Sequence, residues 1–151
     1  MSKFHVLIPA AGSGSRMGIT LPKQYLPLNG KPLIHHALSL FAAAPRITSV
    51  HVVIAPDDAL WTKHEVDHGS KVVVHGLGGA TRAATVLNGL EAIAGQMAED
   101  DWILVHDAAR PGLSMAMLDR LLDSLQEDAV GGLLAIPLAD TLKREGAGQR
   151  V

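Results

Sequence analysis

The stretch PAAGSGSRMGITLPK, from Pro9 to Lys23, directly follows a short apolar run, FHVLI, at residues 4–8. The apolar run is partly β-branched and predicts a buried parallel strand. The small residues after it let consecutive backbone amides approach a ligand closely, and such a loop forms an anion-binding concavity. Arg16 and Lys23 add two full positive charges at the same end of the strand. The stretch therefore predicts a strand followed by a loop that binds polyphosphate.

Two common phosphate-binding motifs do not describe this loop. A P-loop requires Gly-x-x-x-x-Gly-Lys followed by Ser or Thr, and neither Gly14 nor Gly18 precedes that pair. A dinucleotide fingerprint requires Gly-x-Gly-x-x-Gly, and Met17 stands where its third glycine belongs. The fingerprint also needs an acidic residue about 20 positions further on, whereas the first carboxylate of the chain is Asp57. The loop is therefore a third kind of phosphate-binding loop, and the failed fingerprint disfavours a dinucleotide-binding oxidoreductase.

Composition and charge narrow the class of protein. The chain has 151 residues, no cysteine and a formal net charge of −2, which excludes disulfides, thiolate catalysis and cysteine-ligated zinc. Residues 1–56 carry five Lys or Arg and no carboxylate, a pattern that favours a local anion site over general nucleic-acid binding. The first apolar run is too short for a signal segment or a membrane span. We expect one cytoplasmic domain over residues 1–151, with no nucleic-acid or membrane partner.

Strand-like and helix-like segments alternate along the chain. Runs of β-branched residues predict strands, and apolar residues at helical spacing predict helices. This alternation implies a doubly wound, mostly parallel α/β sheet with right-handed crossovers. Residues 57–68 are polar and give no clear signal. After the strand at 4–8, further strands are expected at 49–55, 71–75, 102–106 and 132–136, and helices at 32–44, 81–97 and 114–127.

Ligands of such sheets bind beyond the carboxyl ends of the strands, where three loops are expected to meet. The loop after the first strand is one of them. The second, GLGGA at residues 76–80, leads through Thr81 into a helix whose N-terminus suits polar ligand groups. The third is HDAARP, residues 106–111, in which Asp107 leaves a buried strand. Alone, Asp107 is explained slightly better as a turn or capping residue, but three such loops together favour a binding site.

The histidines do not form a convincing metal motif. His35 and His36 are adjacent, and His64 and His68 form an i, i+4 pair. Neither pair has a third ligand at the spacing that zinc sites show. We interpret these side chains as surface or helix-face residues, and the sequence leaves protein-derived metal ligands unassigned.

The motifs resemble those of the 2-C-methyl-D-erythritol 4-phosphate cytidylyltransferase family. The matching segments are PAAGSGSRMG, PKQY, GGATR, VHDAARP and DTLKR, and they come in family order across nearly the whole chain. The resemblance implies a Rossmann-like α/β fold of the nucleotidyltransferase type. It also implies Mg²⁺-dependent transfer of CMP from CTP to 2-C-methyl-D-erythritol 4-phosphate, which gives 4-CDP-2-C-methyl-D-erythritol and pyrophosphate in non-mevalonate isoprenoid synthesis.

The resemblance also implies roles for single residues. Arg16 and Lys23 would be catalytic, holding the triphosphate and stabilising charge at the α-phosphorus. Small residues and backbone groups would bind the nucleotide, and polar residues at the third loop and in DTLKR would bind the polyol phosphate. The implied nucleotide-binding residues are Ala10, Ala11, Gly12, Gly14, Gly79, Ala80, Thr85 and Ala108, and the implied substrate-binding residues are Asp107, Arg110 and Thr141.

Family members continue beyond the position of Val151. We therefore expect a C-terminally incomplete domain whose dimerisation arm begins near residues 141–151, and a homodimer formed through that arm. Two alternatives stay open for the activity. A related enzyme uses CTP with ribitol 5-phosphate, and the chain would alternatively be a non-catalytic CTP-binding fragment.

Overall fold

The computed structural model describes residues 2–13, 21–64 and 69–144. The chain divides into two compact units, Met1–Met115 and Ala116–Val151. Each unit is described by itself below. Within the described ranges, no helix has the length and apolar character needed to cross a membrane.

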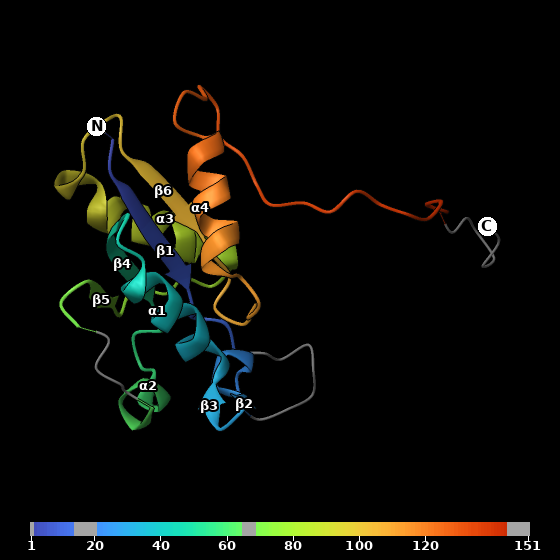
Figure 1. The fold of residues 1–151 in the computed structure, drawn as a ribbon. Helices are drawn as coiled ribbons and strands as arrows, with labels where there is room; N and C mark the ends of the chain where they lie inside the picture. Colours follow the sequence, from blue (N-terminus) through green and yellow to red (C-terminus); the bar gives the residue numbers. More distant parts are fainter. Residues whose placement is uncertain (1, 14–20, 65–68, 145–151) are drawn as a thin grey trace. The chain divides into compact units, whose positions relative to one another are not determined.

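A four-stranded parallel sheet lies at the centre of the first unit, with strand order β5-β4-β1-β6 (Figure 1). The strands are β1 (Phe4–Pro9), β4 (Ile47–Val53), β5 (Val72–His75) and β6 (Trp102–Val105). β1 is a central strand: its residue Leu7 pairs with His51 of β4 on one side and with Val105 of β6 on the other. The apolar side chains of β1 are almost fully buried, as expected for a strand covered on both faces. The predicted parallel sheet is confirmed.

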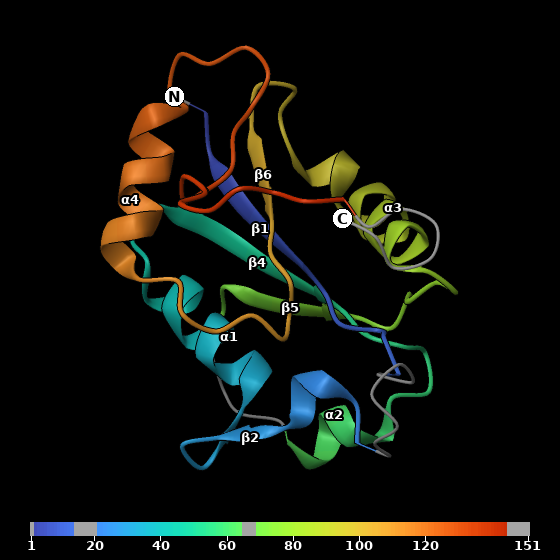
Figure 2. The same cartoon turned by 90° about the vertical axis from the view of Figure 1, so that its right-hand side faces the viewer.

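Two helices cover opposite faces of this sheet, as Figure 2 shows. They are α1 (Leu33–Ala43) and α3 (Arg82–Ile93). On the α3 face, Leu7 and Val53 pack against Ile93 in a buried apolar cluster. Gly89 lets the helix approach closely, because a Cβ there would lie 2.7 Å from Val53 Cγ2 and 2.8 Å from Leu7 Cδ1. This arrangement confirms the doubly wound α/β fold.

Short elements connect β1 to α1 and β4 to β5. The 3₁₀ turn η2 (Lys23–Tyr25) precedes a small hairpin of β2 (Pro27–Leu28) and β3 (Lys31–Pro32). Its two turn residues, Asn29 and Gly30, have φ angles of 50° and 77°, as the tight Asn-Gly hairpin turn requires. The polar region after β4 contains α2 (Ala59–Lys63), which Asp58 caps by accepting from two backbone amides. A second 3₁₀ turn, η3 (Ala94–Gln96), follows α3.

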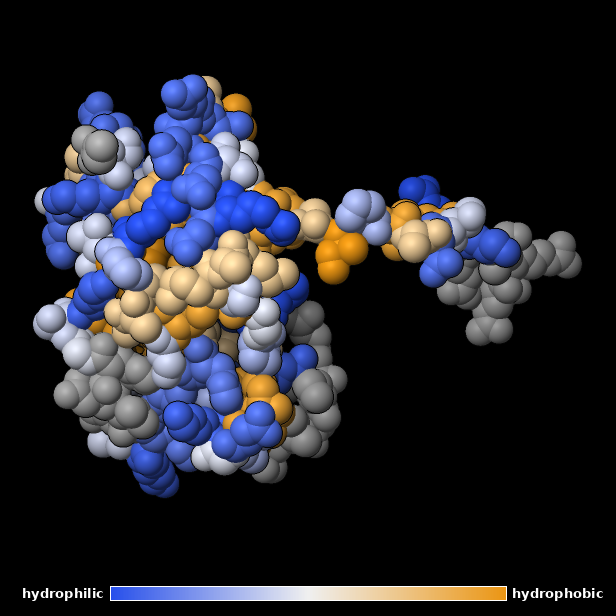
Figure 3. All heavy atoms as spheres, in the orientation of Figure 1, coloured by the Kyte–Doolittle hydropathy of each residue, from blue (hydrophilic) through white to orange (hydrophobic). Residues whose placement is uncertain are grey.

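The second unit follows the start of α4 (Met115–Ser124). The strand predicted at 132–136 is wrong, because these residues form no strand in the structure. A strand is stabilised by ladder hydrogen bonds to a neighbour, and none of the described strands pairs with this segment. Its apolar side chains are exposed instead, 78% for Leu133 and 89% for Ile136. Apolar surface, coloured orange, is visible along the extended part of the chain after α4 in Figure 3.

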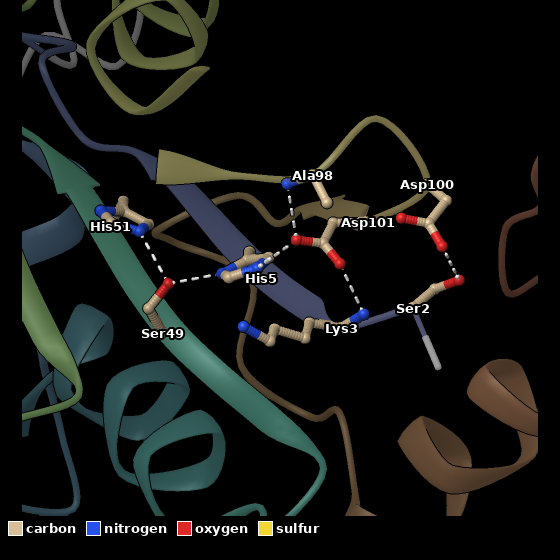
Figure 4. A network of polar contacts seen from close by, with 8 residues as sticks. All are labelled: Ser2, Lys3, His5, Ser49, His51, Ala98, Asp100 and Asp101. Atoms are coloured by element: carbon tan, nitrogen blue, oxygen red, sulfur yellow. Dashed lines mark hydrogen bonds and ion pairs between the residues drawn. The ribbon is translucent and has the colours of Figure 1, made fainter. Parts of the chain in front are cut away.

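A network of polar side chains lies on the same face of the sheet as the side chain of Leu7 (Figure 4). Ser49 Oγ lies 2.7 Å from His5 Nδ1 and 2.7 Å from His51 Nε2. His51 Nδ1 lies 3.1 Å from His75 Nε2 on the edge strand. At the other end, His5 Nε2 is 3.4 Å from Asp101 Oδ2, without a well-formed hydrogen bond. Burial first of all, together with the neighbouring His75 and His5, lowers the pKa of His51 to about 4.

Candidate functional site

The loop after β1 is held by the side chain of Gln24. The loop begins at buried Ala10, whose backbone amide donates to the Val53 carbonyl at 2.8 Å. Gln24 Nε2 donates to the carbonyl of Ala10 at 2.8 Å and to that of Gly12 at 3.2 Å. Lys23 precedes Gln24 in η2 and is exposed, so its backbone adjoins the residue that holds this loop. The predicted residues Gly14 and Arg16 lie outside the described residues.

The loop after β5 meets the loop after β1. The Gly78 amide donates to the Ile54 carbonyl at 2.8 Å. A Cβ added to Gly78 would overlap the Ala11 Cβ and lie 2.8 Å from that same carbonyl oxygen. The absence of a side chain at Gly78 therefore allows these two loops to touch.

The same loop is anchored on the N-terminus of α3. Thr85 is 3% exposed, and its hydroxyl accepts from the Gly79 amide at 3.0 Å and donates to the Thr81 carbonyl at 3.0 Å. Thr81 caps the helix by accepting from the Ala84 amide at 3.1 Å. The exposed Ala80 lies between these contacts. The N-terminus of α3 thus gives this end of the loop a region of positive partial charge.

An ion-pair bridge joins the second loop to the third. Arg82, in the first turn of α3, donates from Nη2 and Nε to Asp107 Oδ1 at 2.8 and 2.9 Å. Arg110 Nε lies 2.8 Å from Asp107 Oδ2. The arginine side chains are 61% and 80% exposed, so both stay accessible to an anion. Sequence reasoning missed Arg82, although its place in GGATR at a helix start was the available signal.

The third loop also borders a cavity of the first unit. The cavity has a volume of about 280 Å³ and is lined by Arg110, His106 and His36, among other residues. His106 packs edge-on against Phe41, with ring centroids 5.2 Å apart, and burial lowers its pKa. The neighbouring Ala108 is buried. Thr141 belongs to the second unit, where it is exposed.

The charges of the described site favour anions. Lys23, Arg82 and Arg110 contribute three cations, and Asp107 contributes one carboxylate whose two oxygens are bound by the arginines. Over the described ranges, no group of three or more His, Asp or Glu side chains is arranged to hold a metal ion. The arrangement suits a polyphosphate and contains loops at the carboxyl edge of the sheet, where α/β proteins bind nucleotides.

Comparison with known proteins identifies the family. The sequence model of the 2-C-methyl-D-erythritol 4-phosphate cytidylyltransferase family matches residues 4–151. The chain belongs to this family. The resemblance seen in the sequence motifs is thereby confirmed.

Two curated members of this cytidylyltransferase family illustrate the similarity. The protein from Nitrosospira multiformis is 58% identical over 147 residues, which cover 95% of this chain and 63% of the relative. The protein from Nitrosomonas eutropha is 55% identical over 154 residues, which cover 100% of this chain and 66% of the relative. Both are named 2-C-methyl-D-erythritol 4-phosphate cytidylyltransferase. The chain spans a little under two thirds of the length of these relatives.

Solved structures agree with the family assignment. A crystal structure of 4-diphosphocytidyl-2C-methyl-D-erythritol synthase matches with a TM-score of 0.84 at 40% identity, covering 99% of this chain and 66% of that one. The Francisella tularensis 2-C-methyl-D-erythritol 4-phosphate cytidylyltransferase matches with a TM-score of 0.69 at 35% identity, covering 85% and 54%. The nucleotidyltransferase type of α/β fold expected from the motifs is confirmed.

Proposed function

We propose that the protein transfers CMP from CTP to 2-C-methyl-D-erythritol 4-phosphate, giving 4-CDP-2-C-methyl-D-erythritol and pyrophosphate. The observation that carries this proposal is the joining of three loops at one edge of the sheet, in a chain of this family. Gln24 holds the first loop, Gly78 meets it, and Arg82 ties the second loop to Asp107 in the third. We further propose that the enzyme acts in the cytoplasm, in non-mevalonate isoprenoid synthesis, as a homodimer.

The proposed chemistry needs positioning and charge more than it needs a base. The nucleophile is a phosphate monoester that is already anionic near neutral pH. One of its oxygens attacks the α-phosphorus of CTP in line, and the bond to the departing pyrophosphate breaks with its electron pair. Lys23 and Arg16 stabilise the charge that develops on the triphosphate. The described site holds cations and backbone amides, which suit this task.

Each substrate has its own part of the proposed site. The nucleotide lies against the first two loops, where Ala10, Ala11, Gly12 and Gly14 give close approach and Ala108 lies near the ribose. Gly79, Ala80 and Thr85 recognise the cytosine, mainly through backbone groups. The polyol phosphate is bound by Asp107, which accepts from its hydroxyl groups, and by Arg110 and Thr141. The exposure of the Arg110 side chain supports its role as an anion ligand.

We propose Mg²⁺ as the cofactor. When bound, the ion neutralises part of the triphosphate charge. The described residues offer no cluster of three or more metal-binding side chains. Since Mg²⁺ is commonly held by substrate phosphates with one or two carboxylates, we expect phosphate oxygens to supply most of its ligands here.

The experiment that tests this function measures Mg²⁺-dependent pyrophosphate release from CTP. Methylerythritol phosphate and ribitol 5-phosphate are offered in parallel, and reactions with UTP or with a chelator serve as controls. Release with methylerythritol phosphate alone supports the proposal. Release with ribitol phosphate alone favours the related polyol enzyme. CTP binding without release from either indicates a non-catalytic nucleotide-binding chain.

A further inference from the structure

Gln24 holds the first loop but has no assigned part in the chemical step itself. Its side chain is buried, with 6% of its surface exposed. Its amide nitrogen donates to the carbonyls of Ala10 and Gly12, at 2.8 and 3.2 Å. Both hydrogens of one NH₂ group are therefore engaged by two carbonyls that flank Ala11. The Gln24 amide therefore bridges the Ala10 and Gly12 carbonyls of the loop.

These contacts turn the carbonyls of Ala10 and Gly12 toward η2. A loop that presents backbone amides to an anion must turn its carbonyl oxygens away from that anion. The carbonyl of the buried Ala10 needs a donor, and Gln24 supplies one there and a second at the exposed Gly12, both from the side of η2. A primary amide of this length provides two donors without a charge, whereas an ionised carboxylate provides none.

The same residue adjoins Lys23 in a closed turn. Lys23 and Gln24 are consecutive in η2, whose turn is closed by Tyr25 N donating to Pro22 O at 2.9 Å and Leu26 N donating to Lys23 O at 3.1 Å. The far side of the turn is anchored by Tyr25 Oη, which donates to Asp58 Oδ2 at 2.7 Å. The loop and the backbone of Lys23 are thus linked through one buried side chain.

We infer that Gln24 is a positioning residue, which sets the Ala10–Gly12 loop and Lys23 in register with one another so that both engage the triphosphate of CTP. The inference rests on the proposed function, because it takes CTP as the ligand. Gln24 itself touches the loop carbonyls and acts through the loop and the lysine.

The test compares Gln24→Met and Gln24→Glu with the wild-type chain in binding of Mg-CTP. Gln24→Met keeps the length and neutrality of the side chain but removes both donors. We expect its Kd for CTP to rise about tenfold, the factor associated with one or two neutral hydrogen bonds. Gln96→Met in η3 is the matched control, since Gln96 is exposed, and it should bind as the wild type does.

Gln24→Glu adds a pH signature that a general packing defect would not give. Burial against two carbonyl oxygens raises the pKa of the introduced carboxyl. At low pH the protonated group donates one hydrogen bond, and at high pH the carboxylate repels both carbonyls. CTP affinity of Gln24→Glu, relative to the wild type at each pH, should therefore improve as the pH falls. A flat ratio across the pH range would contradict the inference.

Hydrogen exchange separates this inference from the proposed function. In Gln24→Met, amides of the loop should exchange faster while those of β4 stay protected, without any ligand present. Unchanged exchange together with wild-type affinity for CTP would overturn the inference. If the wild-type chain does not bind CTP, the proposed function fails, and the exchange result still decides whether Gln24 holds the loop. If Gln24→Met does not fold, the pH dependence of Gln24→Glu decides.

Discussion

Among single residues, Lys23 carries the most specific chemical prediction. It is exposed in η2, next to the buried Gln24 that fixes the first loop. We expect Lys23→Met to lower kcat by about a hundredfold or more, because a pre-positioned charge at the reacting phosphorus is lost. Pyrophosphate release measures the effect, and Lys31→Met in β3 is the matched control. Arg16→Ala should behave like Lys23→Met, and turnover near that of the wild type in either variant would remove the residue from the mechanism.

Asp107 allows a second prediction at the same scale. Its two oxygens accept from Arg82 and Arg110, and the proposed polyol site lies at this carboxylate. Asp107→Asn should raise KM for methylerythritol phosphate about tenfold, since hydrogen bonds to a charged group are lost. KM for CTP should change less than about twofold, because the nucleotide contacts lie on the other loops. Steady-state kinetics with each substrate varied decide this, with the exposed Asp57→Asn as control; a parallel rise in both constants would contradict it.

At the scale of elements, the contact between the loops after β1 and β5 allows a prediction. In Gly78→Ala the new methyl group would overlap Ala11 and press on the Ile54 carbonyl. Such overpacking should destabilise the fold by about 1–3 kcal/mol and also weaken CTP binding. Urea denaturation and CTP titration measure the two effects. Gly95→Ala is the control, because a Cβ there meets nothing within 4 Å. Equal stability of the two variants would show that the loops separate without cost.

The elements themselves were predictable where burial imposes a simple pattern. Runs of β-branched residues predicted the strands β1 and β4, and helical spacing of apolar residues predicted α3. The strand signal is strong because the sheet is covered on both faces and its strands are correspondingly apolar. The segment 132–136 is also apolar but has no partner strand among the described ones. Propensity describes a fit to a pleated surface, so it cannot create the neighbour that a strand needs.

For the molecule as a whole, the sequence predicted which loops meet and missed what joins them. Parallel topology alone brings the loops after β1, β5 and β6 to one edge. The contacts that fix their spacing depend on side chains far apart in sequence: Gln24 lies 14 residues from Ala10, and Arg82 lies 25 residues from Asp107. Such pairs have no local periodicity, and they become visible only when backbone positions in space are known.

The histidine network gives a prediction about the stability of the whole first unit. His51 is 3% exposed between β1 and β5, with His5 and His75 on either side, and burial first of all lowers its pKa from 6.5 to about 4. As the pH falls, His51 in the unfolded chain therefore takes up a proton near pH 6.5, whereas in the folded chain it does so only near pH 4. Stability contributed by neutral His51 is complete above pH 6.5 and falls as the pH drops through that window. Burial also lowers the pKa of His35, His75 and His106, which acts in the same direction.

We expect the free energy of unfolding to fall by about 2 kcal/mol between about pH 7.5 and pH 5 on account of His51 alone. His51→Gln removes the titrating group and keeps a polar side chain beside Ser49, so the acid-induced loss should shrink by roughly that amount. Urea unfolding at the two pH values measures it, and His36→Gln, whose ring faces the Leu28 carbonyl rather than the network, should retain the wild-type dependence. If His51→Gln loses as much stability as the wild type on acidification, protonation of His51 does not limit the fold, and the other buried histidines must account for the loss.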